Sequence, residues 1–299
     1  MGCKCERDAQ ARAEEERSID DLPGNATVLS QFPEPKNEIV LDAMLRASLS
    51  PHAKLSTASS KKDSENEEQN VLQFKDGTVY QGEWEDGKKN GKGRQIWPDS
   101  TYYEGEWKEN LPNGHGRKIL PSGLIIEGTF VNGKASGLAI ISNKEGLKMQ
   151  GVFRNDLPNG NCSAKYPDGS EYEGQMVNMN KQGHGKLSKP DGSSYEGEFM
   201  NDMRDGYGIL TWKDGRRYEG QWKDDKMHGT GTHQWADGSV YQGGYLNDLK
   251  HGNGEFRWPD GRVFKGTWEN GDRQGVGVLI KGGVEKKGIW KDDVRVNWL

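Results

Sequence analysis

One pattern of aromatic residues and glycines returns every 23 residues along most of the chain. It can be followed in YQGEWEDGKKNGKG (80–93), YEGEWKENLPNGHG (103–116) and YEGQWKDDKMHGTG (218–231). A fixed period of this length predicts a repeat array in which each unit packs on its neighbours. Half-units, 74–79 and 286–293, flank nine full units, which begin at Tyr80, Tyr103, Ile126, Met149, Tyr172, Tyr195, Tyr218, Tyr241 and Phe264.

Each unit carries the signature of a β-hairpin. Tyr80, Gly82 and Trp84 alternate with polar residues, and period two is typical of a strand. A Gly-x-Gly pair and a second alternating stretch follow, and an Asp-Gly turn leads to the next unit. The glycines leave room for neighbouring rings on one face. The sequence therefore predicts an all-β, elongated single sheet, roughly 85 Å long at the usual strand spacing.

Charge is distributed unevenly along the chain. Residues 1–70 hold 9 Lys and Arg against 14 Asp and Glu, whereas residues 71–299 hold 32 of each sign. A balanced array offers no basic stripe for a nucleic-acid backbone, so we expect no nucleic-acid partner. The same balance weakens direct attraction to anionic lipid headgroups.

These residues resemble the MORN repeat family, whose hallmark is Tyr-x-Gly-x-Trp, a short turn and a Gly-x-Gly pair at 23-residue spacing. The resemblance implies an elongated all-β groove used for assembly, membrane association or partner docking, without chemistry of its own. The third unit departs from the hallmark with Ile126, Phe130 and Ala139. The fourth departs with Met149, Phe153 and Cys162. This stretch is either degenerate or a bend or partner site with a more aliphatic surface.

The repeat aromatics are the candidate partner-binding residues of residues 71–299. Exposed rings in a concave strip can dock a helix or an extended peptide, although the same rings also hold adjacent hairpins together. Strand edges at the terminal half-units could also pair with a second copy of the chain. The predicted groove lining consists of Tyr80, Trp84, Tyr103, Trp107, Tyr218 and Trp222.

Residues 1–70 have a different composition, and we expect a largely disordered tail. Within it, residues 38–49 place Leu41, Met44, Leu45 and Leu49 on one face of a short amphipathic helix that ends before Pro51. Such a helix either packs on the first hairpins as a cap or contacts a partner or a membrane.

The chain begins MGCKCERD. Removal of Met1 would expose Gly2 to N-myristoylation, and Cys3 and Cys5 would then be close enough to a membrane for S-palmitoylation. One myristoyl chain binds a membrane only marginally, so the second signal must come from the cysteines. The arrangement resembles the dually acylated start of Src-family kinases, but Glu6 stands where the modification rule favours Ser or Thr.

No catalytic constellation stands out in the sequence, and we expect neither enzymatic activity nor a cofactor. His115 and His184 lie between the paired glycines, and His228 and His251 lie just before them. Equivalent positions in separate hairpins do not converge on one metal, so we expect no metal site within one chain. A metal site shared between two chains remains an alternative.

The function that these features favour is a non-catalytic scaffold or adaptor on the cytoplasmic face of a membrane, such as the plasma membrane, cell cortex or ciliary membrane. Acyl chains would hold the membrane, and the repeats would bind protein partners. One alternative is a soluble component of a ciliary, axonemal or cytoskeletal assembly. The other is a regulatory module whose repeats bind phospholipid.

Overall fold

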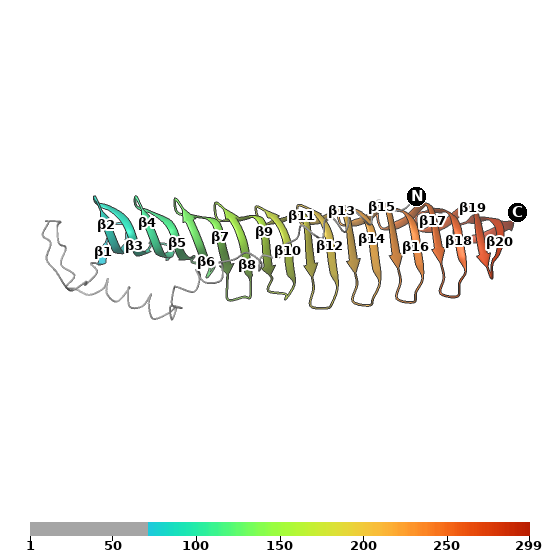
Figure 1. The fold of residues 1–299 in the computed structure, drawn as a ribbon, viewed down its shortest axis with the longest axis horizontal. Coiled ribbons are helices and arrows are strands. Elements are labelled where there is room, and N and C mark those ends of the chain that lie inside the picture. The colour runs from blue at the N-terminus through green and yellow to red at the C-terminus, as the bar shows by residue number, and fades with distance from the viewer. Residues whose placement is uncertain (1–70) are drawn as a thin grey trace. The chain divides into compact units, whose positions relative to one another are not determined.

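The structure is a computed structural model that describes residues 71–299, and regular structure there consists of β-strands (Figure 1). The 21 strands belong to one open antiparallel sheet, which confirms the predicted all-β repeat fold. The predicted tail, its helix near 38–49 and the residues Gly2, Cys3 and Cys5 lie outside the described residues. The strands are β1 Val71–Gln73, β2 Val79–Glu85, β3 Lys88–Ile96, β4 Tyr102–Lys108, β5 Leu111–Ile119, β6 Ile125–Val131, β7 Lys134–Ser142, β8 Lys148–Arg154, β9 Leu157–Lys165, β10 Glu171–Val177, β11 Asn180–Ser188, β12 Ser194–Met200, β13 Met203–Thr211, β14 Arg217–Lys223, β15 Lys226–Gln234, β16 Val240–Leu246, β17 Leu249–Arg257, β18 Val263–Glu269, β19 Asp272–Lys281, β20 Val284–Lys291 and β21 Val294–Trp298.

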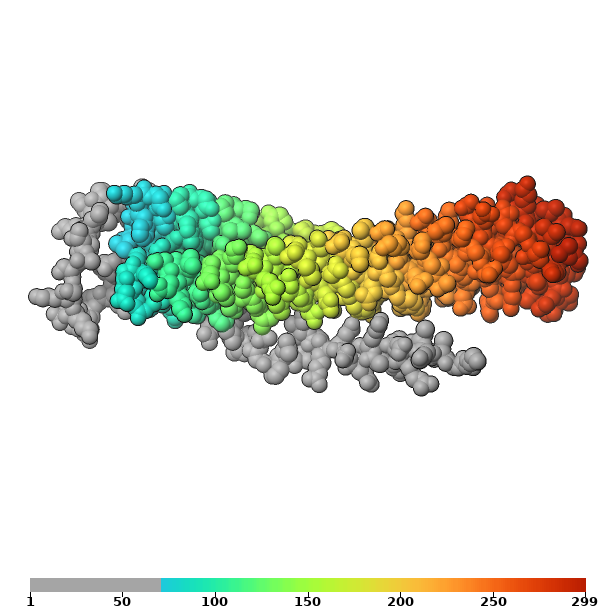
Figure 2. All heavy atoms as spheres, turned by 90° about the horizontal axis from the view of Figure 1, so that it is seen from above, coloured from blue at the N-terminus to red at the C-terminus, as the bar shows by residue number. Residues whose placement is uncertain are grey.

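From β3 to β21 every strand pairs with the strand that follows it in the chain. Along residues 80–299 the colours of Figure 2 change in chain order without mixing. Within residues 80–299, segments far apart in the sequence therefore do not lie side by side. Each hairpin is stabilised by its two neighbours, as in other repeat proteins.

Two-residue turns close the hairpins. At Asp224–Asp225 both residues have positive φ, 46° and 65°, the geometry of the turn whose twist matches a hairpin. Asn and Asp tolerate this left-handed region better than other side chains, which explains their recurrence here. The polar residues after the first strand of each unit therefore form a short turn and the start of a long second strand. From sequence alone this second strand was expected to begin only after the Gly-x-Gly pair.

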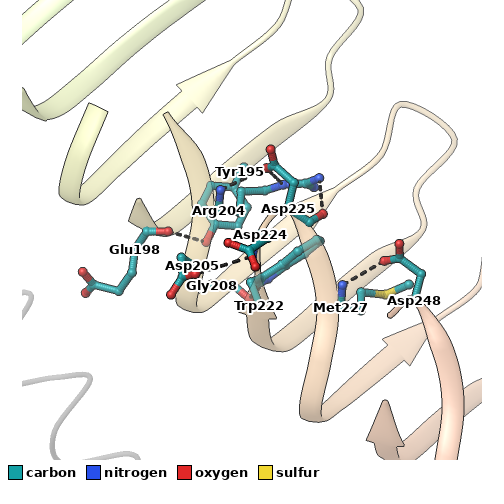
Figure 3. Close-up of polar contacts among 10 residues, drawn as sticks. All are labelled: Tyr195, Glu198, Arg204, Asp205, Gly208, Trp222, Asp224, Asp225, Met227 and Asp248. Atoms are coloured by element: carbon teal, nitrogen blue, oxygen red, sulfur yellow. Dashed lines mark hydrogen bonds and ion pairs between the residues drawn. The ribbon is translucent and has the colours of Figure 1, made fainter. Parts of the chain in front are cut away.

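The turns also link one hairpin to the previous one. The backbone N–H of Arg204 donates to Oδ1 of Asp225 at 2.9 Å, and the N–H of Asp225 donates to the carbonyl of Arg204 at 3.0 Å. Met227 and Asp248 repeat both bonds one unit later (Figure 3). These bonds satisfy backbone groups that a turn would otherwise leave to solvent, and they fix the spacing between units.

A row of glycines crosses the sheet perpendicular to the strands. Gly208 pairs with Gly220, Gly220 with Gly231, and Gly231 with Gly243. Beside this row the register shifts within each hairpin, for example between Gly220 and Trp222. Gly229 lies in this bulge with a φ of +62°, which a residue with a side chain adopts only under strain. The glycine row leaves one face of the sheet free for aromatic rings.

Candidate functional site

The aromatic face is built from tyrosines that lie flat over the glycine row. A methyl carbon placed on Gly231 would lie 2.6 Å from Cε2 and Cζ of Tyr218, so the ring occupies the space that a side chain would fill. The Tyr218 hydroxyl donates to the carbonyl of Gln221 at 3.0 Å. The other tyrosines in this position donate to the carbonyl three residues on in the same way: Tyr80, Tyr103, Tyr172, Tyr195 and Tyr241.

A second row of rings joins successive tyrosines. Trp222 meets Tyr218 of its own unit edge-on at 5.1 Å and Tyr195 of the previous unit at 5.6 Å. Its indole N–H donates to the carbonyl of Gly208 at 3.2 Å. Edge-to-face pairs add about 0.5–1.5 kcal/mol each beyond the area that they bury. Together with the aliphatic side chains that replace rings in some units, such as Ile126, Met149 and Met176, the rings form a continuous core that runs from hairpin to hairpin.

Cationic side chains cover part of this core. The guanidinium of Arg204 lies 4.2 Å from the Trp222 ring centroid, and its Nε lies 2.9 Å from Oδ1 of Asp225 (Figure 3). Arg273 forms the corresponding ion pair with Asp293 at 2.8 Å. Lys250 places its ammonium 4.1 Å from the Trp268 ring. These cations lie against the inner rings, and two of them also reach rings nearer the other strand ends: Lys250 is 5.3 Å from Phe256 and Arg273 is 5.8 Å from Trp258.

On the other side, an aromatic surface stays partly exposed. We call it the aromatic ridge; it consists of Trp212, His233, Trp235, Phe256 and Trp258. Successive ring centroids are 5.2, 4.2, 5.4 and 4.7 Å apart. His233 is buried between the two flanking indoles, and the three tryptophans and Phe256 are partly exposed. None of these five residues is among the groove-lining residues that the sequence predicted.

The repeat units match a known protein family. The model described as "MORN repeat" matches residues 80–102, 103–125, 127–142, 150–171, 172–194, 195–216, 218–240, 241–261 and 264–282, together more than half of the chain. The chain belongs to the MORN repeat family. Arrays of this type bind proteins or membranes through their extended repeated surface.

Similarity of the MORN array to individual proteins is weak. No curated protein matches the sequence. Two of the solved structures found are the G-box domain of the microcephaly protein CPAP, at 13% identity and a TM-score of 0.27, and the TCP10c domain of Drosophila melanogaster Sas-4, at 11% identity and a TM-score of 0.27. The first similarity covers 75% of this chain and 99% of that domain, and the second covers 65% and 96%.

Most of the predicted groove lining lies in the core of the MORN array. Tyr80, Tyr103 and Tyr218 are fully buried, and Trp107 and Trp222 are nearly so. Trp84 differs, because 39% of its surface is exposed and one aromatic ring, Tyr80, contacts it. A partner contact through these six residues stays a prediction, and the exposed surface favours Trp84 among them.

The departures in the third and fourth MORN units are coupled substitutions. Where Ile126 replaces the tyrosine, Ala139 replaces the glycine beneath it, and Met149 is matched by Cys162 in the same way. A shorter side chain leaves room for the extra carbon or sulfur, and the strand register is unchanged. Burial raises the pKa of the Cys162 thiol to about 11, which makes it unreactive at neutral pH.

Between residues 71 and 299, no three His, Cys, Asp or Glu side chains lie where they could share a metal ion. In the same part of the chain there is no helix with the length and apolar character needed to cross a bilayer.

His233 makes the stability of the ridge sensitive to pH. Burial, and then the positive charges of Arg216 and Lys250, lower the pKa of His233 from 6.5 to about 4, against a small opposite effect of Asp214. Between these two values the unfolded chain binds the proton more readily, so the free energy of unfolding falls as the pH falls. We expect a lower melting temperature at about pH 5 than at about pH 7.5.

A His233→Leu variant is the control, because Leu210 occupies the same position one unit earlier. Its melting temperature should change less between the two pH values than that of the unmodified protein. An equal change in both proteins would show that other groups cause the pH dependence.

Proposed function

We propose that this protein is a non-catalytic scaffold that is tethered to the cytoplasmic face of a membrane by N-terminal acylation and binds protein partners through its MORN array. The observation that carries the tether is the sequence MGCKCERD, which places Gly2 beside two cysteines. Two acyl chains together hold a protein on a membrane far more firmly than one. Basic residues are too few here to replace the second chain, because Lys4 and Arg7 are soon followed by Glu14, Glu15 and Glu16.

The MORN array supports the scaffold part of the proposal. It repeats the same pair of strands over many units, and among residues 71–299 no three His, Cys, Asp or Glu side chains lie where they could share a metal ion. Its equal numbers of acidic and basic residues argue against headgroup binding by charge, so the tether is assigned to the acyl chains.

The test is membrane fractionation in a eukaryotic cell. The intact protein should sediment with membranes, and both Gly2→Ala and the double variant Cys3→Ser/Cys5→Ser should move largely to the soluble fraction. Cys162→Ala is the matched control, because it removes the buried thiol and unit three carries alanine at the equivalent position, Ala139. If all four proteins distribute alike, the acylation proposal is wrong. A shared soluble fraction would then favour a soluble assembly component, and a shared membrane fraction would favour membrane binding by the repeats.

A further inference from the structure

The aromatic ridge has a regular spacing that the rest of the array does not share. Its three tryptophans come from consecutive units, β12–β13, β14–β15 and β16–β17, where each directly follows the second strand at one equivalent position. In the other units this position holds Trp97, Leu120, Asn143, Tyr166, Lys189 and Lys281, so tryptophan recurs without interruption only at 212, 235 and 258. Equivalent positions in neighbouring units are two strand spacings apart, about 9.6 Å.

This spacing matches one ligand conformation closely. A polyproline II helix has three residues per turn and a rise of about 3.1 Å per residue, so every third residue returns to the same side after about 9.3 Å. A proline-rich segment lying across the strands would place one proline over each indole in turn. An α-helix returns to the same side every 5.4 Å, so two turns span about 10.8 Å and depart further from the tryptophan spacing than a polyproline II helix does.

The hydrogen-bonding capacity of the ridge agrees with the same ligand. Within residues 71–299, the indole N–H groups of Trp212, Trp235 and Trp258 donate to no protein acceptor, and none of them is a buried unsatisfied donor. By contrast, Trp107 and Trp222 donate to backbone carbonyls. A proline-rich segment in this conformation has no internal hydrogen bonds, so its carbonyls are free to accept from such donors.

A cationic side chain near the ridge favours a ligand segment that carries an acidic residue. The Lys250 ammonium lies 5.3 Å from the Phe256 ring, and no carboxylate of residues 71–299 lies within ion-pair distance of it. Burial and Arg273 lower the pKa of Lys250, and the more distant carboxylates of Asp293 and Asp272 oppose this shift only in part. Arg216 and Arg262 lie 5.0 and 5.1 Å from the rings of Trp212 and Trp258, at the two ends of the ridge. Both arginines are paired with the aspartate of their own turn, which leaves Lys250 as the cation that a ligand carboxylate can neutralise.

We propose that the aromatic ridge binds a proline-rich, acidic segment of a partner protein in the polyproline II conformation. The proposal rests on the role of the MORN array as a protein-binding scaffold and names the chemistry of one partner. It does not depend on the lipid anchor, because the ridge belongs to the array alone.

The test uses the full-length protein and a fluorescein-labelled peptide of repeating Pro-Pro-Glu triplets, about 12 residues long, which spans the three indoles. Fluorescence anisotropy should show saturable binding. A Gly-Gly-Glu peptide of equal charge should bind at least about tenfold more weakly, because it lacks the preformed helix. A helical peptide of equal charge should also bind more weakly.

Variants then locate the site. Trp235→Leu should weaken binding about tenfold or more, and the leucine of unit two at this position, Leu120, indicates that the fold accepts it. Trp97→Leu is the matched control, since it removes a tryptophan of the same position outside the ridge, and it should leave binding unchanged. Lys250→Gln should weaken binding of the Pro-Pro-Glu peptide more than that of a Pro-Pro-Gln peptide.

Three results would each overturn the proposal. The first is that the Pro-Pro-Glu peptide fails to bind, the second that the Gly-Gly-Glu peptide binds equally well, and the third that the Trp235→Leu protein binds as tightly as the unmodified protein. Tighter binding of the helical peptide would replace the extended ligand with a helix. Membrane fractionation of the same proteins reports separately on the tether, so a failure here would leave that result standing.

Discussion

Replacing Gly231 with alanine should lower the free energy of unfolding by on the order of 3 kcal/mol. The added carbon would lie 2.6 Å from two ring atoms of Tyr218. That ring has little freedom to move away, because its hydroxyl is bonded to the Gln221 carbonyl and Trp222 and Tyr245 contact it at 5.1 and 5.2 Å. Urea unfolding monitored by tryptophan fluorescence measures the loss, and hydrogen exchange in β14 and β15 shows whether it is local.

The third unit supplies the control for this variant. Its combination of Ile126 and Ala139 predicts that Tyr218→Ile would relieve the overlap that Gly231→Ala creates. In a double-mutant cycle the combined loss should be smaller than the sum of the two single losses by more than about 1 kcal/mol. Additive losses would contradict the explanation that ring and glycine are coupled.

Replacing Trp107 with alanine should cost about 4 kcal/mol of unfolding free energy, the usual loss for a buried aromatic residue. The indole packs edge-on against Tyr80 and Tyr103 at 5.2 and 5.3 Å, and its N–H donates to the carbonyl of Gly93 at 2.9 Å. The substitution removes these ring contacts and takes away a hydrogen-bond donor to that carbonyl.

Trp84→Ala is the matched comparison, since Trp84 meets the same Tyr80 ring at 5.2 Å but is 39% exposed. Its loss should be smaller, about 2 kcal/mol, because the exposed part of the indole is not removed from water on folding and contributes nothing to stability. Both values can be read from chemical denaturation. Equal losses would mean that burial does not separate core rings from exposed ones in this array.

The sequence determined the fold well because its dominant constraint is local and repeated. The alternation around Tyr218, Gly220 and Trp222 predicts strands, and the pairing of a ring with a glycine predicts which face is packed. Both features are present in the structure. The early start of the second strand was missed, because the polar residues at Lys226 and His228 lack an apolar alternation that would distinguish strand from loop.

The candidate site was harder to foresee, because exposure depends on neighbouring units and not on the repeat itself. The pattern gives Trp84 and Trp107 the same position, yet Trp107 is almost completely buried and Trp84 is not. The aromatic ridge depends on which residues three successive units place at one strand end. Its signal was visible as the run of Trp212, Trp235 and Trp258, but whether those indoles face solvent required coordinates.

The constant register between strands restricts how such a chain can change in length during evolution. One residue inserted into a strand would move the following side chains of that strand to the opposite face and place rings where charges belong. Gain or loss of a whole 23-residue unit leaves both faces intact and changes the distance between the ends of residues 80–299 by about 9.6 Å. The array can thus act as a molecular ruler whose length is set by gene duplication in discrete steps.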